Sequence, residues 1–349
     1  MHFVFFFLIL ALAIIARAGS RKVKLQLYMA AVLCLLFFCA FRDGAWYPDI
    51  LNYYDYFKGQ YGLSDENFGW GYKLLNNSCR SISNEFQLLL IVISIIVVWS
   101  YTKFIKDYSP MIWLSLLLYM LINYYPSFFL LRQYLAIAIA LFSIKFVINR
   151  NPIKFGIVAI LAFSFHASAI LIVPLYFLYG IKNTRLNMVL LSIGIVATID
   201  LFYSFQDYVN LFSAYYAHYF ETEVEEAAWQ RAVLKIYITV VYLYTMKRSY
   251  YDEGINRIVF YGMILNVAIC VAAMNIFSAH RLREYFAFAD FVGVPLIIDK
   301  AKSIKGLKKT VVLLLSFIYI VVLAITFYNF IMGNMNYHEY QFFWKGSYQ

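Results

Sequence analysis

Charged residues are scarce in this chain of 349 residues. Only 14% of the residues are charged, whereas 63% are hydrophobic and 20% are aromatic. A soluble domain carries about a quarter charged residues and about half apolar ones, so this chain lacks the polar surface that a soluble fold of its length needs. The shortage of charge therefore argues against a soluble enzyme, a nucleic-acid binder and a disordered scaffold.

Cysteine is equally scarce, and its placement indicates no special chemistry. Three of the four cysteines lie inside apolar runs and none forms a C-x-x-C pair, which argues against a disulfide framework or a redox motif. No H-x-x-x-H, no paired D-x-D and no His/Cys cluster predicts a divalent-metal site. No Gly-rich loop follows a strand, so no nucleotide site is indicated. We expect neither a metal nor a cofactor.

Long apolar runs fill most of the chain. A helix crosses the bilayer with about 20 apolar residues, in a range of roughly 17 to 25. The candidate spans are residues 3–16, 23–41, 86–101, 110–123, 128–148, 187–205, 231–246, 258–278, 284–299 and 310–332. The pattern predicts an all-α polytopic membrane protein that forms a single transmembrane domain over residues 1–349.

The basic residues, which give the chain a net charge of +10, indicate how it is oriented. Loops rich in Lys and Arg face the cytoplasm, and here they are residues 17–24, 103–106, 145–154, 182–185, 247–257 and 300–309. Alternating sides then require an even number of crossings between Lys154 and Lys182. Residues 153–179 should therefore form two short spans that turn near Phe165, His166 and Ala167. The result is about 12 spans (11–13), with both termini outside.

Two polar segments fall on the predicted outer face. Residues 42–85 mix acidic and aromatic side chains, as is typical of a segment that caps a cavity or lies along the membrane interface in short helices. Residues 206–230 are acidic, and their glutamates fit a solvated helical face.

Several arginines lie where the predicted spans end on the outer side. Arg42 ends the second span, Arg132 begins the fifth, and Arg281 and Arg283 lie between the tenth and the eleventh. Charges at membrane depth are costly and mark functional sites. Guanidinium groups bind phosphate through a bidentate fork, so several at one depth fit a diphosphate. The alternative for any single arginine is a snorkelling side chain whose head lies among the lipid headgroups.

Two further residues at this depth are candidates for proton transfer or orientation. His166 titrates near neutrality and can accept a proton from a sugar hydroxyl. The alternative is a hydrogen-bonded core histidine at a helix break, beside Ser164 and Ser168. Asp49 fits a base, an acceptor for a hydroxyl group or a partner for an arginine.

At these residues the sequence resembles the EpsG family of polysaccharide polymerases, which are related to the Wzy-type O-antigen and capsule polymerases. The matching pieces are Phe41-Arg42 with Pro48-Asp49, Leu131-Arg132-Gln133-Tyr134-Leu135-Ala136, Phe165-His166-Ala167-Ser168-Ala169, and Arg281 with Tyr285-Phe286. Their order and spacing cover most of the chain.

The resemblance implies a metal-independent glycosyltransferase on the periplasmic face of the bacterial inner membrane. Such an enzyme moves a growing O-antigen, capsule or exopolysaccharide chain from its undecaprenyl diphosphate carrier onto the next lipid-linked repeat unit. The implied partners are undecaprenyl-diphosphate-linked oligosaccharides, membrane lipids and a chain-length regulator, without nucleic acid.

The same resemblance suggests roles for the singled-out residues. Arg132 and Arg281 hold the diphosphate, with Arg42 and Arg283 assisting, because positive charge stabilises the departing phosphate. His166 is the expected base for the acceptor hydroxyl, and Asp49 orients a sugar or an arginine.

Other membrane proteins compete with this interpretation. A lipid-linked oligosaccharide flippase needs a similar basic pocket without a base, but its charges belong at the middle of the membrane. An outer-face glycan ligase fits the same residues. A metal-dependent transferase is disfavoured because Asp43 and Asp49 form no acidic pair. A membrane acyltransferase or a structural membrane protein leaves the arginines unexplained.

Overall fold

The computed structural model describes residues 2–43, 49–60, 68–181, 228–246, 254–274, 277–332 and 342–345. Within these ranges the chain is helical and forms no β-strand, which confirms the all-α prediction. Among the described residues, five helices are long and apolar enough to cross a membrane, and four shorter apolar helices accompany them. The chain is thus a multi-pass membrane protein, while the number of twelve spans stays a prediction. The predicted span 187–205 and residues 206–227 of the acidic segment lie outside the described residues.

The chain divides into two compact units. The first contains Met1–Phe146, Asn151–Ile170 and Ile320–Gln349, and the second contains Val147–Arg150 and Leu171–Tyr319. The predicted single transmembrane domain over residues 1–349 stays a prediction.

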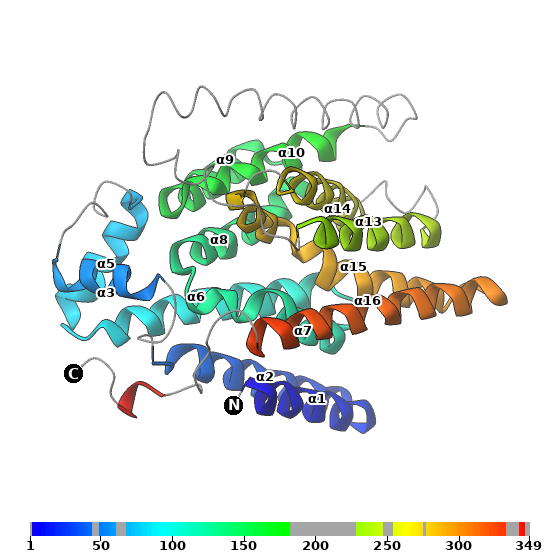
Figure 1. Ribbon diagram of the computed structural model, residues 1–349, viewed down its shortest axis with the longest axis horizontal. Helices are drawn as coiled ribbons and strands as arrows, with labels where there is room; N and C mark the ends of the chain where they lie inside the picture. Colours follow the sequence, from blue (N-terminus) through cyan, green and yellow to red (C-terminus); the bar gives the residue numbers. More distant parts are fainter. Residues whose placement is uncertain are drawn as a thin grey trace. The chain divides into compact units, whose positions relative to one another are not determined.

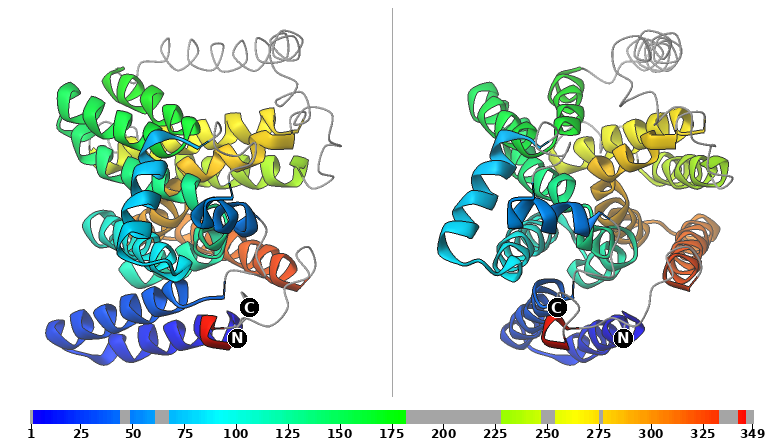
Figure 2. Two further views of the ribbon diagram at one scale, coloured as in Figure 1. Left: turned by 90° about the vertical axis from the view of Figure 1, so that its left-hand side faces the viewer. Right: turned by 60° about the vertical axis from the view of Figure 1, so that its left-hand side comes forward.

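The first unit begins with a helical hairpin. α1 (His2–Ala18) and α2 (Arg21–Ala40) lie side by side (Figures 1 and 2). Ser20 caps α2, because its hydroxyl accepts a hydrogen bond from the backbone N–H of Val23 at 3.4 Å. α2 also packs along α6 (Phe86–Tyr108). The other elements of this unit are α3 (Ile50–Lys58), α5 (Trp70–Ile82), α7 (Ile112–Tyr119), the π-helical turn η1 (Met120–Tyr124), the 3-10 turn η2 (Pro126–Phe128), α8 (Leu131–Ile148, to Phe146), α9 (Pro152–Phe165), and η6 (Phe343–Lys345).

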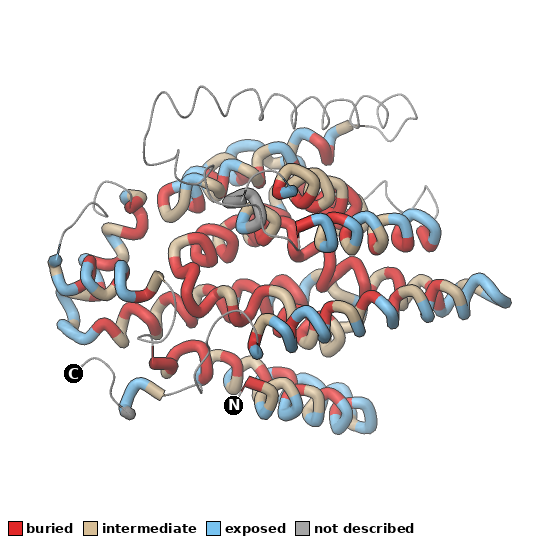
Figure 3. The backbone as a smooth tube through the Cα atoms, viewed as in Figure 1, coloured by how far each residue is buried: buried red, intermediate tan, exposed pale blue. Residues whose placement is uncertain are grey.

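Burial separates the core helix α8 from the outer hairpin. α8 is buried along most of its length, whereas α1 exposes large apolar side chains (Figure 3). Val4 and Phe7 of α1 are exposed by 61% and 60%. Exposed apolar surface of this size fits contact with lipid, because lipid does not penalise it as water does.

The predicted break near residues 165–167 is confirmed as a helix end. α9 begins after Asn151, whose side chain accepts a hydrogen bond from the backbone N–H of Lys154 at 3.0 Å. It ends at His166, where the backbone becomes extended (φ −154°, ψ 127°). The 3-10 helix η3 (Ala167–Ile172) and α10 (Val173–Gly180) follow. That residues 153–179 cross the membrane twice stays a prediction.

The second unit is built around α14 (Gly254–Ala272). It packs against α10, α13 (Ala228–Thr245), α15 (Phe288–Ala301) and the 3-10 segment η5 (Phe277–Phe286). α16 (Leu307–Met332) contributes its residues up to Tyr319.

Several predicted spans differ from the observed helices. The span 86–101 continues as α6 to Tyr108. The span 284–299 begins as a 3-10 helix and becomes α-helical only at Phe288. The span 258–278 starts earlier, at Gly254, and its α-helix ends at Ala272. The span 110–123 changes from α-helix to a π-helical turn at Met120. Apolar content alone does not distinguish these helix types, because all of them pair their backbone groups locally.

Two glycines bring α14 and α15 into close contact. A Cβ at Gly262 would lie 2.9 Å from Cζ of Phe288 and 3.2 Å from Cβ of Ala289. A Cβ at Gly293 would lie 3.0 Å from Cγ1 of Val259. Each helix therefore presents a glycine to side chains of the other.

We expect Gly262→Ala to lower the free energy of unfolding by about 1–3 kcal/mol, because an added methyl group overpacks this contact. Thermal unfolding of the purified protein in detergent measures the effect. Gly156→Ala in α9 is the matched control, since a Cβ there meets nothing within 4 Å. Equal melting temperatures for the two variants would contradict the close contact.

Candidate functional site

Arg132 lies in the first turn of α8 against a cluster of aromatic rings. Its guanidinium carbon is 4.3 Å from the ring centre of Phe68 and 5.8 Å from that of Tyr53. Tyr56 and Tyr72 complete this aromatic cluster, with ring-centre distances to Phe68 of 4.5 and 5.2 Å. Stacking on aromatic faces stabilises a guanidinium and fixes its orientation. The cluster comes from the segment 42–85, so this segment positions a predicted phosphate-binding residue.

Tyr53 connects Arg132 with Asp49. Burial raises the pKa of the Tyr53 hydroxyl and the nearby Asp49 carboxylate raises it further, while the charge and hydrogen bonding of Arg132 lower it. Asp49 begins α3 in a left-handed backbone conformation (φ 64°). That conformation is uncommon outside glycine, although Asp adopts it more readily than most residues. Asp49 and Arg132, both singled out from the sequence, thus act in opposite directions on the pKa of one tyrosine.

The segment Phe68–Tyr72 lies beside two predicted site residues, Arg132 and His166. Phe68 and Tyr72 belong to the aromatic cluster around Arg132. Gly69 and Gly71, which alternate with them, lie against the last turn of α9: a Cβ at Gly69 would overlap the Ser164 carbonyl, and one at Gly71 would overlap the Ser164 hydroxyl. We call Phe68–Tyr72 the bridging segment.

His166 directly follows this contact, at the end of α9. Its Nδ1 lies 2.6 Å from the Ser168 hydroxyl oxygen, and the backbone N–H of Ser168 points to the same nitrogen at 3.3 Å. The side chain is partly exposed. Both Ser168 groups thus contact the same ring nitrogen of His166. Ser168 therefore orients the imidazole.

Arg42 has a different environment, because its side chain is completely buried at the end of α2. Nε and one terminal nitrogen donate to the carbonyl of Phe128 at 3.1 and 2.9 Å. The other terminal nitrogen donates to the Cys39 carbonyl and, at 3.2 Å, to the Ser94 hydroxyl. All three guanidinium nitrogens thus contact protein acceptors and tie α2 to α6 and to η2. The predicted part of Arg42 in diphosphate binding stays a prediction.

The other two predicted arginines belong to the second unit, where η5 carries both. Arg281 is exposed, whereas Nε of Arg283 donates to the Glu284 carboxylate at 3.1 Å. Glu284 is buried and offsets the charge of Arg283.

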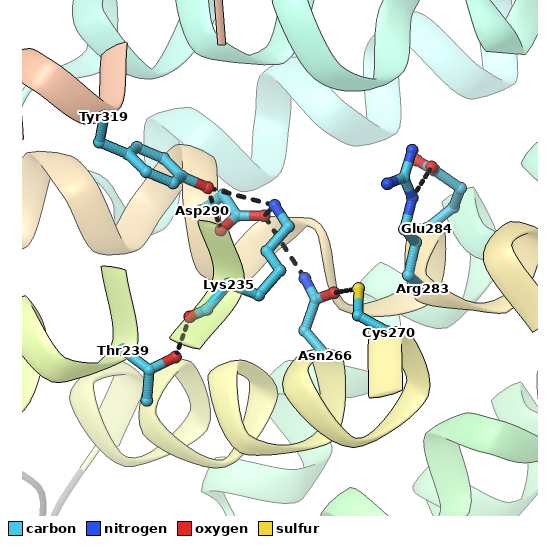
Figure 4. A network of polar contacts seen from close by, with 8 residues as sticks. All are labelled: Lys235, Thr239, Asn266, Cys270, Arg283, Glu284, Asp290 and Tyr319. Atoms are coloured by element: carbon cyan, nitrogen blue, oxygen red, sulfur yellow. Dashed lines mark hydrogen bonds and ion pairs between the residues drawn. The ribbon is translucent and has the colours of Figure 1, made fainter. Parts of the chain in front are cut away.

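A buried charge network in the second unit was missed by the sequence analysis. Nζ of Lys235 in α13 lies 2.5 Å from the Asp290 carboxylate in α15, and the Tyr319 hydroxyl of α16 donates to the other carboxylate oxygen at 2.8 Å (Figure 4). Asn266 of α14 adds a longer contact to Asp290 at 3.4 Å. The available signal was a charged residue inside each of the predicted spans 231–246 and 284–299.

Comparisons with known proteins agree with the residue pattern. The family model described as the EpsG family matches residues 25–342. No curated protein and no solved structure matches the chain.

We expect Gly71→Ala to displace the end of α9, because its Cβ would lie 3.0 Å from Cβ of Ser164 and 3.1 Å from Cε2 of Phe165. The displacement should lower the activity, measured as the rate of chain growth in the nanodisc assay described under Proposed function. Ser164→Gly removes the obstructing Ser164 atoms and leaves only the 3.1 Å contact with Phe165, so the double variant should recover most of the lost activity. Gly156→Ala in the same α9 should have no effect, since a Cβ there has open space. A double variant as impaired as Gly71→Ala alone would contradict the bridging contact.

We expect Arg42→Met to lower the free energy of unfolding by about 2–5 kcal/mol, because buried carbonyl groups lose their donors. Thermal unfolding measures this loss, with Arg17→Met as the control at an exposed arginine of α1. An Arg42→Met protein that melts like the wild type but has lost activity would instead support substrate binding by Arg42.

Proposed function

Because the chain belongs to the EpsG family, a family of Wzy-like polysaccharide polymerases, we propose that it polymerises lipid-linked oligosaccharide units. The substrate class is an undecaprenyl-diphosphate-linked repeat unit, and the growing glycan moves onto each new unit at the periplasmic face of the inner membrane. The observation that carries the proposal is the bridging segment, which contacts both the Arg132 cluster and the helix end that leads to His166.

In the proposed reaction, one hydroxyl group of the incoming repeat unit attacks the anomeric carbon of the growing glycan. A new carbon–oxygen bond forms while the bond between the anomeric carbon and the diphosphate oxygen breaks. The hydroxyl proton passes to the imidazole of His166, and undecaprenyl diphosphate leaves as the anion. Proton acceptance by a positioned histidine speeds such a step by typically about 10²–10⁴-fold.

Arg132 is proposed to stabilise the charge that develops on the leaving diphosphate. Its guanidinium lies at the amino end of α8, where the helix dipole also favours an anion. The aromatic cluster holds the guanidinium, so little reorganisation is needed when charge develops. Asp49, close to Tyr53, is proposed to orient a sugar hydroxyl or Arg132.

Arg281 is proposed as a further phosphate-binding residue on the basis of its exposure and chemistry. Arg283 has the smaller part, since Glu284 already binds it. A chain-length regulator is the proposed protein partner.

A lipid-linked oligosaccharide flippase remains the second candidate function, because the buried Lys235–Asp290 pair supplies charge inside an apolar helix bundle. An outer-face ligase would use the Arg132 and His166 chemistry with a different acceptor.

We expect purified wild-type protein in nanodiscs to convert a synthetic undecaprenyl-diphosphate repeat unit into a product ladder with chelator present and no nucleotide sugar. Arg132→Ala should slow chain growth by about 10²–10³-fold, as loss of one electrostatic stabiliser does. The rate of chain growth by Arg132→Lys should lie between those of the wild type and Arg132→Ala, because lysine keeps the charge but cannot form the bidentate contact with phosphate. His166→Ala should slow growth by about 10²–10⁴-fold.

Arg17→Ala is the control, since Arg17 is an exposed arginine at the end of α1. Folding of each variant is checked by its melting temperature. If folded wild type made no ladder but moved a fluorescent lipid-linked oligosaccharide across the bilayer, the flippase would be supported. Wild-type rates in folded Arg132→Ala would rule out the role given to Arg132.

A further inference from the structure

The Asp290 carboxylate ties the start of α15 to three other helices. It accepts hydrogen bonds from Lys235 of α13 at 2.5 Å, Tyr319 of α16 at 2.8 Å and Asn266 of α14 at 3.4 Å (Figure 4). Asp290 lies in the first turn of α15, where the helix dipole also favours a negative charge. Lys235 contacts the Tyr319 hydroxyl as well, at 3.1 Å. The network therefore fixes the first turn of α15 from several sides.

Stability alone does not account for a buried ion pair. Removing two charges from water costs several kcal/mol per ion, and well-packed apolar residues in the same place are often as stable or more so. In α15 the rest of the early helix is apolar and buried, from Phe288 to Pro295. A charged pair in such surroundings is better explained by the geometry that it enforces.

The segment next to this network is the part of η5 that carries Arg281 and Arg283. η5 runs directly into α15 through Ala287, and it packs against both α14 and α15. Arg283 and Glu284 lie within electrostatic reach of Cys270, as do Lys235 and Asp290. The exposed Arg281 is therefore carried by a short segment whose following helix turn is held in place.

We propose that Lys235 and Asp290 are positioning residues that fix the segment 281–287, and through it Arg281, in the orientation that binds a phosphate group. This inference rests on the proposed function for its kinetic consequence, but its structural consequence can be measured without any activity. Lys235 and Asp290 themselves touch no substrate.

The test replaces the network by apolar residues in the full-length protein in nanodiscs: Lys235→Met, Asp290→Leu and Tyr319→Phe together. The melting temperature should stay near or above the wild-type value, because no unpaired charge remains. Hydrogen exchange of the amides of residues 281–287 should rise about tenfold or more, since local opening is no longer opposed. KM for the lipid-linked repeat unit should rise about tenfold with little change in kcat, as expected for lost binding.

The matched control is Asp299→Leu with Lys302→Met, which removes an exposed ion pair (2.8 Å) from the other end of α15. It should leave exchange and KM unchanged. A folded triple variant with wild-type exchange and wild-type KM would overturn the proposal. If the triple variant does not fold, Tyr319→Phe alone keeps both charges and removes one hydrogen bond to Asp290. Its exchange at 281–287 should rise about threefold, and unchanged exchange would overturn the proposal.

The two proposals fail in different ways. Faster exchange at residues 281–287 together with an inactive wild type would refute the polymerase function and keep the positioning role. An active wild type with unchanged exchange in the folded variants would refute the positioning role and keep the polymerase function.

Discussion

A polar group buried at membrane depth has no water to bind, so it must find its partner inside the protein. Two buried charges illustrate this constraint. Arg42 directs its guanidinium at backbone carbonyls and a serine hydroxyl, and Lys235 pairs with Asp290. In both cases, satisfying the charge joins helices that are distant in sequence. Buried charges that find their partners inside the protein, together with close glycine contacts, therefore join helices within each unit.

The residues proposed for chemistry lie at the ends of such fixed helices. Arg132 is in the first turn of α8, His166 ends α9 and Arg281 precedes α15. A helix end places a side chain at a boundary, with a rigid element behind it and partial exposure in front. This arrangement combines orientation with access, which transfer between two lipid-linked substrates requires.

The sequence predicted local features well and contacts poorly. Apolar runs indicated most helices, and the His166 break followed from charge alternation, because both are properties of neighbouring residues. The bridging segment was not predicted, because its contacts join residues that are distant in sequence: Phe68 contacts Arg132, and Gly69 and Gly71 contact Ser164. Lys235 and Asp290 were visible as charges in apolar runs, but their pairing, over 55 positions, was not. The 3-10 start of the span 284–299 has no apolar signature.

The glycines of the bridging segment have a mechanical consequence. The backbone of Gly69 lies directly against the Ser164 carbonyl, and that of Gly71 against the short Ser164 side chain, so no long flexible group lies there to absorb a displacement. A shift of Phe68 or Tyr72 would therefore be transmitted to the end of α9. The aromatic rings around Arg132 and the backbone that leads to His166 would then move together.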